Sequence, residues 1–428
     1  MLVENRSWVR VTTLSEFIEK APPLGAVDLA PGSYPEMMEW SGGSWHNFLD
    51  RYPESNLLYR KMLRVSDAVA AMEGPAEEKE KARDLLYQGQ SNDPYWHGVF
   101  GGLYLLHLRM HNYRSLLAAE NIAHPQAGLE VEQVDFDGDG QLEALDSSPR
   151  LNCYVHRLGG QVVELDHRAV SWNLLATLTR RRERYHDQAE DADCDWYPRR
   201  ALIDHFLRED TSFDTFAHCK HGEQGDFVNQ LYKVEVGERE GETDVILRRD
   251  GGVWAGPVFL PITLTKRLTF TADSSRFDVE YRLEHSGEKP LPLWFACESN
   301  FIFSSGDAPG RYYQLDGRGE KPALDTWADH RDVSEIALTD EWVGGGVKLR
   351  FAEPTNIWTF PILTLSQGLE GWRRSYQGSC VTAHWRLNLR PGQPWKVSFT
   401  VELTDVPRAA EGAEIDKEQP RISAEGRG

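Results

Sequence analysis

The chain has 428 residues, of which 40% are hydrophobic and 11% aromatic, and its formal net charge at pH 7 is −20. This length is sufficient to bury a sizeable core and suggests two or three domains. A field of this sign repels phosphate backbones and anionic lipid. It therefore argues against nucleic acid and membrane surfaces as partners and favours a neutral substrate.

Five cysteines are spread widely along the chain without a CxxC pair. Their odd number and spacing predict free thiols in a reducing compartment, not a disulfide framework or a zinc site. They are Cys153, Cys194, Cys219, Cys297 and Cys380. The start, MLVENRSWVR, lacks the apolar core of a signal peptide. No apolar run approaches the ~20 residues needed to cross a bilayer, so we expect a cytoplasmic protein.

Residues 1–52 are mixed in composition and too poor in apolar residues to bury a core alone. The stretch VTTLSEFIEK predicts a short helix that begins at Thr13 or Ser15. Further on, SYPEMMEW supplies Tyr34 and Trp40, which are candidate substrate-binding residues. Its glutamates share one helix face and would project side by side, so they would not flank a glycosidic bond as a catalytic pair must.

Residues 53–120 are predicted to form three helices. From Leu58 to Met72, apolar residues recur at gaps of four, three, four and three, which gives one apolar face. A glycine and a proline separate this helix from the next, and the third helix is expected to include Phe100. Amphipathic helices with short connections are typical of an antiparallel bundle. Residues 121–127 follow as a linker.

From residue 128 the apolar residues alternate with a period of two, without alternation of strands and helices. The segments 233–252, 265–285 and 380–403 each predict a β-hairpin. Residues 128–405 therefore predict a large antiparallel β-sandwich. The polar tail, residues 406–428, is predicted to be disordered.

The stretch SNDPYWHGVFGGLYLLHLR, residues 91–109, places an acid, a proline, aromatics and three glycines at the expected start of the third helix. Glycine in a helix costs roughly 1 kcal/mol against alanine, so close approach of a backbone or a ligand is indicated. Trp96 offers a stacking face, Asp93 an acceptor for hydroxyls, and His97 a donor or acceptor, as in carbohydrate sites. The alternative is a glycine-lined helix crossing capped by Asn92 or Asp93. Composition alone leaves both open.

A second candidate site is DFDGDGQLE, residues 135–143, where acidic residues alternate and glycines allow a tight loop. Its oxygen ligands suit calcium, although no glutamate stands at the twelfth loop position, as an EF-hand requires. The candidate ligands are Asp135, Asp137, Asp139, the carbonyl of Gln141 and the carboxylate of Glu143. The alternative is an acidic hairpin turn held by Asx-type hydrogen bonds.

Two further polar stretches are interpreted as structural. Alternation in LWFACESNFIF points Glu298 and Asn300 to the same side of a strand, which indicates a polar strand face in preference to a sugar-binding concavity. The arginine run in SWNLLATLTRRRERYH, residues 171–186, is interpreted as a locally paired surface of an acidic chain.

Several segments together resemble one family. VTTLSEFIEKAPPLGAVDLAPGSYPEMMEW, RYPESNLLYRKMLRVSDAV and NDPYWHGVFGGLYLLHLR resemble the later half of the 4-α-glucanotransferases and α-amylases of glycoside hydrolase family 57. LEVEQVDFDGDGQLEALDSSPRLNCYVHRLGGQVVELDHRAV and LWFACESNFIF resemble the C-terminal β-domain of that subgroup. The resemblance covers nearly the whole chain up to about residue 405. YWHGVFGG, its most specific part, is similar to the last of the family's signature regions.

The resemblance implies an α+β fold in three parts. The expected parts are a short remnant of a (β/α) barrel end at residues 1–52, a three-helix bundle, and a β-sandwich of the jelly-roll, galactose-mutarotase-like kind. It also implies that the helix entrance lines the active-site cleft. Asp93, Trp96 and His97 match the motif positions that contact the bound glucan.

The resemblance further implies a retaining mechanism with a Glu nucleophile and an Asp general acid, both on a barrel that precedes the matched region. These carboxylates are absent here, and without a nucleophile no glycosyl-enzyme intermediate forms. We therefore expect the chain alone to be inactive and to require no cofactor. It is then the C-terminal half of a split enzyme with a separate barrel chain, a truncated form of the enzyme, or a stand-alone binding protein for α-1,4-glucans or maltooligosaccharides. Amylase and transferase specificity are not separated.

Overall fold

The computed structural model describes residues 4–29, 35–97, 101–125, 128–183, 185–186, 192–368 and 371–408. The chain divides into two compact units, Met1–Arg51 and Tyr52–Gly428. Beyond residue 408, the predicted disordered tail lies outside the described residues.

The first unit contains short helices only in the part that is described. They are α1 (Leu14–Lys20), α2 (Pro35–Ser41) and α3 (Trp45–Arg51). α1 begins as predicted, because the Thr13 side chain caps it by accepting a hydrogen bond from the Glu16 amide at 3.3 Å. α2 and α3 pack together, and a guanidinium nitrogen of Arg51 donates to the carbonyl of Trp40 at 2.7 Å.

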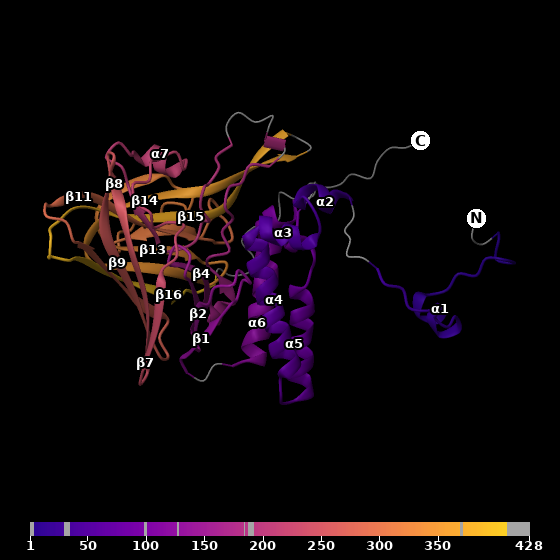
Figure 1. Cartoon of the computed structure of the whole chain (residues 1–428). Coiled ribbons are helices and arrows are strands. Elements are labelled where there is room, and N and C mark those ends of the chain that lie inside the picture. The colour runs from indigo at the N-terminus through magenta and orange to yellow at the C-terminus, as the bar shows by residue number, and fades with distance from the viewer. Residues whose placement is uncertain are drawn as a thin grey trace. The chain divides into compact units, whose positions relative to one another are not determined.

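In the second unit, three helices lie side by side and pack on one another in pairs (Figure 1). They are α4 (Pro53–Ala71), α5 (Ala76–Gly89) and α6 (Leu106–Ala123). The predicted apolar stripe of α4 is confirmed at Leu58 and Val65, which are fully buried. α5 and α6 approach closely: a Cβ atom added to Gly89 would lie 2.6 Å from a methyl carbon of Leu116. A helical bundle is therefore present, as predicted.

The predicted start of the third helix is wrong, because α6 begins only at Leu106. The preceding chain forms two short 3₁₀ turns, η1 (Asp93–Tyr95) and η2 (Gly102–Tyr104). Gly101 and Gly102 have φ angles of +95° and +46°, outside the helical region. A Cβ atom at Gly102 would lie 2.3 Å from the carbonyl oxygen of Trp96. Close approach of a backbone, one of the two reasons expected for these glycines, is thus confirmed at Gly102.

Two antiparallel sheets follow in the described part of the chain. The five-stranded sheet pairs its strands in chain order: β1 (Glu130–Val134), β2 (Glu143–Ser147), β3 (Leu151–His156), β4 (Gln161–His167) and β5 (Trp172–Asn173). The 3₁₀ turn η3 (Arg168–Val170) joins β4 to β5.

The second sheet has eleven strands. They are β6 (Ile203–Phe206), β7 (Lys233–Arg239), β8 (Glu242–Ala255), β9 (Val258–Thr271), β10 (Arg276–His285), β11 (Leu291–Phe301), β12 (Arg311–Leu315), β13 (Ala328–Asp340), β14 (Gly345–Gly368), β15 (Gly371–Leu389) and β16 (Trp395–Asp405). The order is β6-β11-β15-β14-β16-β10-β9-β8-β7, with β13 also pairing with β14 and β12 with β13. The short helix α7 (Phe213–Ala217) packs through Phe216 into a buried cluster with Trp358 and Phe360 of β14.

Two of the three predicted hairpins are confirmed. β7 pairs with β8, and β9 pairs with β10. The third is wrong in its pairing: β15 and β16 are strands, but β14 lies between them. Residues 345–351 of β14 pair with β16, and residues 356–368 pair with β15.

Buried polar contacts join the bundle to the sheets. The fully buried guanidinium of Arg109, on α6, donates to the carbonyl of Ala176 at 3.0 Å and to the side-chain oxygen of Gln377 at 2.8 Å. The fully buried Lys61, on α4, forms ion pairs with Glu120, Glu164 and Asp166. Helices and sheets therefore share one compact unit.

The fold class is α+β, with a helical bundle and an antiparallel β-sandwich, as predicted. The five cysteines are all free thiols, which is also as predicted. Among the described residues, no helix combines the length and the apolar character needed to span a bilayer.

Candidate functional site

The predicted entrance residues differ sharply in exposure. Asp93 is exposed, Trp96 is half-buried, and His97 is only 2% exposed. Asn92 precedes the turn η1 but forms no side-chain capping hydrogen bond, so capping does not explain the polar residues at this position. Asp93 and part of Trp96 are therefore exposed to solvent at this turn.

The buried side of this turn is held by a carboxylate that the sequence analysis missed. Glu183 accepts hydrogen bonds from the hydroxyls of Tyr52, at 3.0 Å to each oxygen, and Tyr104, at 2.6 Å. The Nε2 atom of His97 lies 3.7 Å from the same carboxylate. The His97 ring stands edge-on to both tyrosine rings, with centroid distances of 4.7 and 5.0 Å. His97 therefore positions the turn beneath Trp96.

Electrostatics keep Tyr104 as a hydrogen-bond donor. Burial, reinforced by the neighbouring carboxylate, raises the pKa of Tyr104 well above its ordinary value. Its carbonyl accepts a hydrogen bond from the Gln377 side chain on β15 at 3.0 Å. The turn is thus fixed both to the bundle and to the β-sandwich.

Glu183 belongs to the arginine run that was interpreted as a locally paired surface, and that interpretation is wrong. The side chain of Arg180 is 3% exposed and pairs with Asp195 at 2.7 Å. Arg181 pairs with Glu54 of α4 at 2.7 Å and stacks on the Tyr52 ring. The run contains the partners of distant acidic residues, which a local reading of charge does not reveal.

Two other candidate substrate-binding residues lie in the first unit. Tyr34 lies outside the described residues. Trp40 is half-buried on α2, and its carbonyl accepts from Arg51 as described above. Binding by either side chain remains a prediction.

The candidate calcium loop connects β1 to β2, and it uses its acidic residues unequally. Asp135 accepts hydrogen bonds from the amides of Gly138 and Gly140, at 2.8 and 3.1 Å. Gln141 donates its amide to the Asp139 carboxylate at 2.7 Å. These are the Asx-type bonds of the alternative interpretation, and they leave Asp135 and Gln141 outside the cluster that the other residues form.

That cluster gains one member from β3. Nε2 of His156 lies 3.2 Å from Asp137, 3.4 Å from Asp139 and 3.4 Å from Glu143. The four ligand atoms lie within 4.8 Å of one another, close enough to hold a metal ion. Glu143 is fully buried and its Oε1 atom has no hydrogen-bond partner among the described residues. Burial, opposed by His156, raises its pKa to about 7.

The protonation of His156 limits which cations fit. Its Nδ1 accepts a hydrogen bond from the amide of Leu158 at 2.8 Å, and a neutral imidazole then carries its proton on Nε2. In this arrangement the proton on Nε2 faces the carboxylates, of which Asp137 is nearest at 3.2 Å, and Nε2 is not itself a metal ligand. Asp137, Asp139 and Glu143 supply three oxygens, so a calcium ion would draw its remaining ligands from carbonyls or water.

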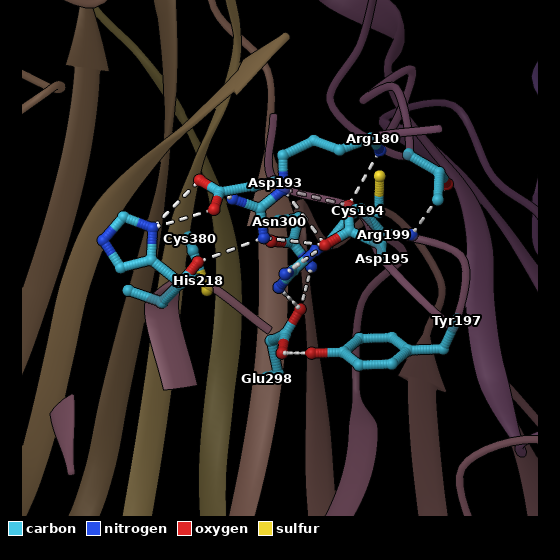
Figure 2. Close-up of polar contacts among 12 residues, drawn as sticks. Arg180, Asp193, Cys194, Asp195, Tyr197, Arg199, His218, Glu298, Asn300 and Cys380 are labelled. Atoms are coloured by element: carbon cyan, nitrogen blue, oxygen red, sulfur yellow. Dashed lines mark hydrogen bonds and ion pairs between the residues drawn. The ribbon is translucent and has the colours of Figure 1, made fainter. Parts of the chain in front are cut away.

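Glu298 and Asn300 lie in a buried network, not in a sugar-binding concavity. Figure 2 shows Glu298 between Arg199, at 2.8 Å, and the hydroxyl of Tyr197, at 2.8 Å. The Asn300 side chain donates to the same carboxylate at 2.6 Å. Burial alone would raise the pKa of Glu298, but Arg199 and His205 hold it well below its usual range. These polar strand residues are structural, as preferred from the sequence.

Comparison with known proteins identifies the family of this chain. The family model "Alpha-amylase/4-alpha-glucanotransferase, C-terminal" matches residues 135–194 and 188–399, and the middle-domain model of the same family matches residues 43–123. The chain belongs to the α-amylase/4-α-glucanotransferase family.

Individual relatives agree. The chain is 31% identical to α-amylase 1 of Dictyoglomus thermophilum, over 92% of this chain and 64% of the relative. It is 30% identical to the 4-α-glucanotransferase of Thermococcus litoralis, over 87% of this chain and 60% of the relative. The crystal structure of the Thermococcus litoralis enzyme superposes with a TM-score of 0.72, covering 92% of this chain and 61% of that one. The chain thus spans about 60% of the length of these relatives.

Proposed function

We propose that this chain supplies the α-glucan-binding part of an α-amylase- or 4-α-glucanotransferase-type enzyme, and that the carboxylates that cleave the glucan lie outside its 428 residues. One observation carries the proposal. The exposed Asp93 and the half-buried Trp96 share a turn whose buried side is locked by the Glu183 cluster. An indole held in place beside an exposed carboxylate suits a sugar ring and its hydroxyls.

The buried carboxylate of Glu183, which holds this turn, is unsuited to catalysis. Retaining cleavage needs two carboxyl groups ~5–5.5 Å apart, one of them a free nucleophile. Glu183 is buried beneath the turn, and its oxygens are bound to two tyrosine hydroxyls. It therefore orients the binding groups and does not attack the sugar.

Isothermal titration with maltoheptaose tests this assignment. The unsubstituted chain is expected to bind, and Trp96→Ala is expected to remove the site at the turn because the stacking face is lost. Trp254→Ala is the matched control, since Trp254 is an exposed tryptophan on β8. The purified chain is not expected to disproportionate maltotetraose. Identical isotherms for Trp96→Ala and the unsubstituted chain would contradict the site, and appreciable turnover would contradict the location of the carboxylates.

A stand-alone α-glucan-binding protein is the second candidate, and it is favoured by the engagement of the Glu183 carboxylate with two tyrosine hydroxyls, which leaves that carboxylate a positioning role only. The two are distinguished by adding the part of a family enzyme that this chain does not match. Transferase or amylase activity that appears only in the mixture indicates a separate barrel-containing chain as partner. Unchanged binding without activity indicates a binding protein.

We also propose that the loop between β1 and β2 holds a divalent cation on Asp137, Asp139 and Glu143. Thermal unfolding with calcium, magnesium or zinc, each against EDTA, measures this. At a calcium concentration of about 100 Kd the expected stabilisation is about 2.7 kcal/mol. Asp139→Asn is expected to remove it, and Asp67→Asn, an exposed residue of α4, to keep it. A melting temperature that no cation changes would leave the Asx turn as the only role of the loop.

A further inference from the structure

A pocket of about 490 Å³ lies on the eleven-stranded sheet and shares no residue with the turn or the loop described above. Its lining comes from β11, β13, β14, β15, the first residue of β16, and residues 211–213 at the start of α7. Trp294 and Trp358 contribute large apolar surfaces, and Arg331 and Arg386 contribute cations. The volume falls in the range of small-molecule sites, and the mixture of aromatic walls with a few polar groups is the composition such sites have.

Three buried polar groups that line this pocket have no hydrogen-bond partner among the described residues. They are the Nε1 atom of Trp358, the Nε2 atom of His384 and the hydroxyl of Thr211. Trp358 and His384 are each 3% exposed and Thr211 is 8% exposed. Buried polar groups in native proteins are almost always paired, so the gathering of three unpaired groups at one cavity points to a ligand that pairs with them.

The hydrogen-bond pattern fixes what these groups offer. The indole of Trp294 donates to Nδ1 of His384 at 3.1 Å, so the neutral imidazole carries its proton on Nε2. Burial, together with the charges of Arg331 and Arg386, lowers the pKa of His384 to about 3, which keeps it neutral. Trp358 and His384 therefore present two N–H donors to acceptor oxygens, and Thr211 presents a hydroxyl.

The charges of the pocket balance. Arg331 donates to Asp329 at 2.6 Å, and the Arg386 guanidinium lies over the Trp294 ring at 3.9 Å from its centroid. Asp332 is a second carboxylate in the lining. Two cations and two anions suit a neutral ligand better than a phosphate or a carboxylate. Hydroxyl oxygens that both accept from N–H groups and donate to carboxylates meet this description, and aromatic walls suit the apolar face of a sugar ring.

We propose that this pocket binds one pyranose residue of a neutral saccharide, with the N–H groups of Trp358 and His384 donating to its hydroxyl oxygens. The site is separate from the turn at Trp96 and does not depend on the activity proposed above. The β-sandwich would then bind a sugar, or the end of a glucan chain, at a site of its own.

Indole N–H resonances of the ¹⁵N-tryptophan-labelled protein test the proposal locally, since the chain has only 14 tryptophans. The resonance missing from Trp358→Phe identifies Trp358, and it is expected to shift on addition of glucose or maltose. Trp358→Phe keeps an aromatic ring but loses the N–H, which has no hydrogen-bond partner among the described residues. We therefore expect a folded variant with about three- to tenfold weaker binding, the loss of one neutral hydrogen bond. Trp254→Phe is the matched control.

Two results would overturn the proposal. The first is a Trp358 resonance that neither sugar moves at saturating concentration. The second is tighter binding of glucose 6-phosphate or inorganic phosphate than of glucose, which would make the two arginines an anion site. Trp96→Ala is expected to leave the shift of the Trp358 resonance unchanged, so the pocket and the turn are tested separately.

Discussion

Replacing Lys61 with methionine is expected to lower the free energy of unfolding by about 3–5 kcal/mol, the usual cost of removing one partner of a buried ion pair. Lys61 is fully buried, and its Nζ lies 3.0 Å from Glu120, 2.9 Å from Glu164 and 3.1 Å from Asp166. Burial and the nearby Asp166 raise the pKa of Glu164 well above its ordinary value. The variant would leave Glu120 and Asp166 buried without the cation that both contact.

Urea denaturation followed by circular dichroism measures this effect. Lys81→Met on α5, an exposed lysine, is the matched control and is expected to change stability by less than about 0.5 kcal/mol. Adding Asp166→Asn to Lys61→Met is expected to recover part of the loss, because it removes one of the two unbalanced charges. Equal stability of the Lys61 and Lys81 variants would mean that the cluster contributes nothing.

Glu298→Gln is expected to cost a similar amount, about 3 kcal/mol. Glutamine keeps the size of the side chain but turns one acceptor into a donor. Its amide would then face donors, since Arg199, Tyr197 and Asn300 all donate to Glu298 at 2.6–2.8 Å. Glu335→Gln is the control, because Glu335 also lies on a strand and pairs with an arginine, Arg350, but is partly exposed. Similar losses for both variants would contradict a special role of burial.

The same variant has a defined pH signature. The pKa of Glu298 is held well below its ordinary value in the folded chain. Its stabilisation is therefore fully present above the unfolded pKa of ~4.3 and is lost as pH falls below it. Glu298→Gln lacks this titration, so the fall in its stability between neutral and acid pH should be shallower than in the unsubstituted chain. An identical acid profile would mean that Glu298 is not the ionised group.

Local patterns predicted much of the fold, because the information lay within short segments. The apolar stripe of α4 and the alternation in β7 to β10 depend only on neighbouring residues. The pairing of β15 and β16 was wrong because proximity in sequence favours a hairpin, whereas β14 supplies partners to both strands. No local signal identifies a strand that inserts between two consecutive ones.

Site residues were missed for the same reason: their partners lie far away in the sequence. Glu183 is separated from its partner Tyr52 by 131 positions, and it was hidden in a run of arginines. His156 joins the acidic loop only because β3 lies beside β2 in the sheet. Asp93 and Trp96, in contrast, were singled out from the sequence because an unusual composition, including three glycines, stands within one short stretch, and their binding role stays a prediction. Sequence thus located the turn but not the groups that hold it.

The guanidinium of Arg109 has a consequence for how this protein can be divided. The two family models meet between residues 123 and 135, which suggests dividing the chain into two fragments at that point. A fragment cut there would separate Arg109 from Ala176 and Gln377 and expose a cation that keeps the carbonyl of Leu103 as an acceptor but loses these two. The two matched regions therefore belong to one folding unit. In amide hydrogen exchange, α6 and β15 should be protected to the same extent, because they unfold cooperatively.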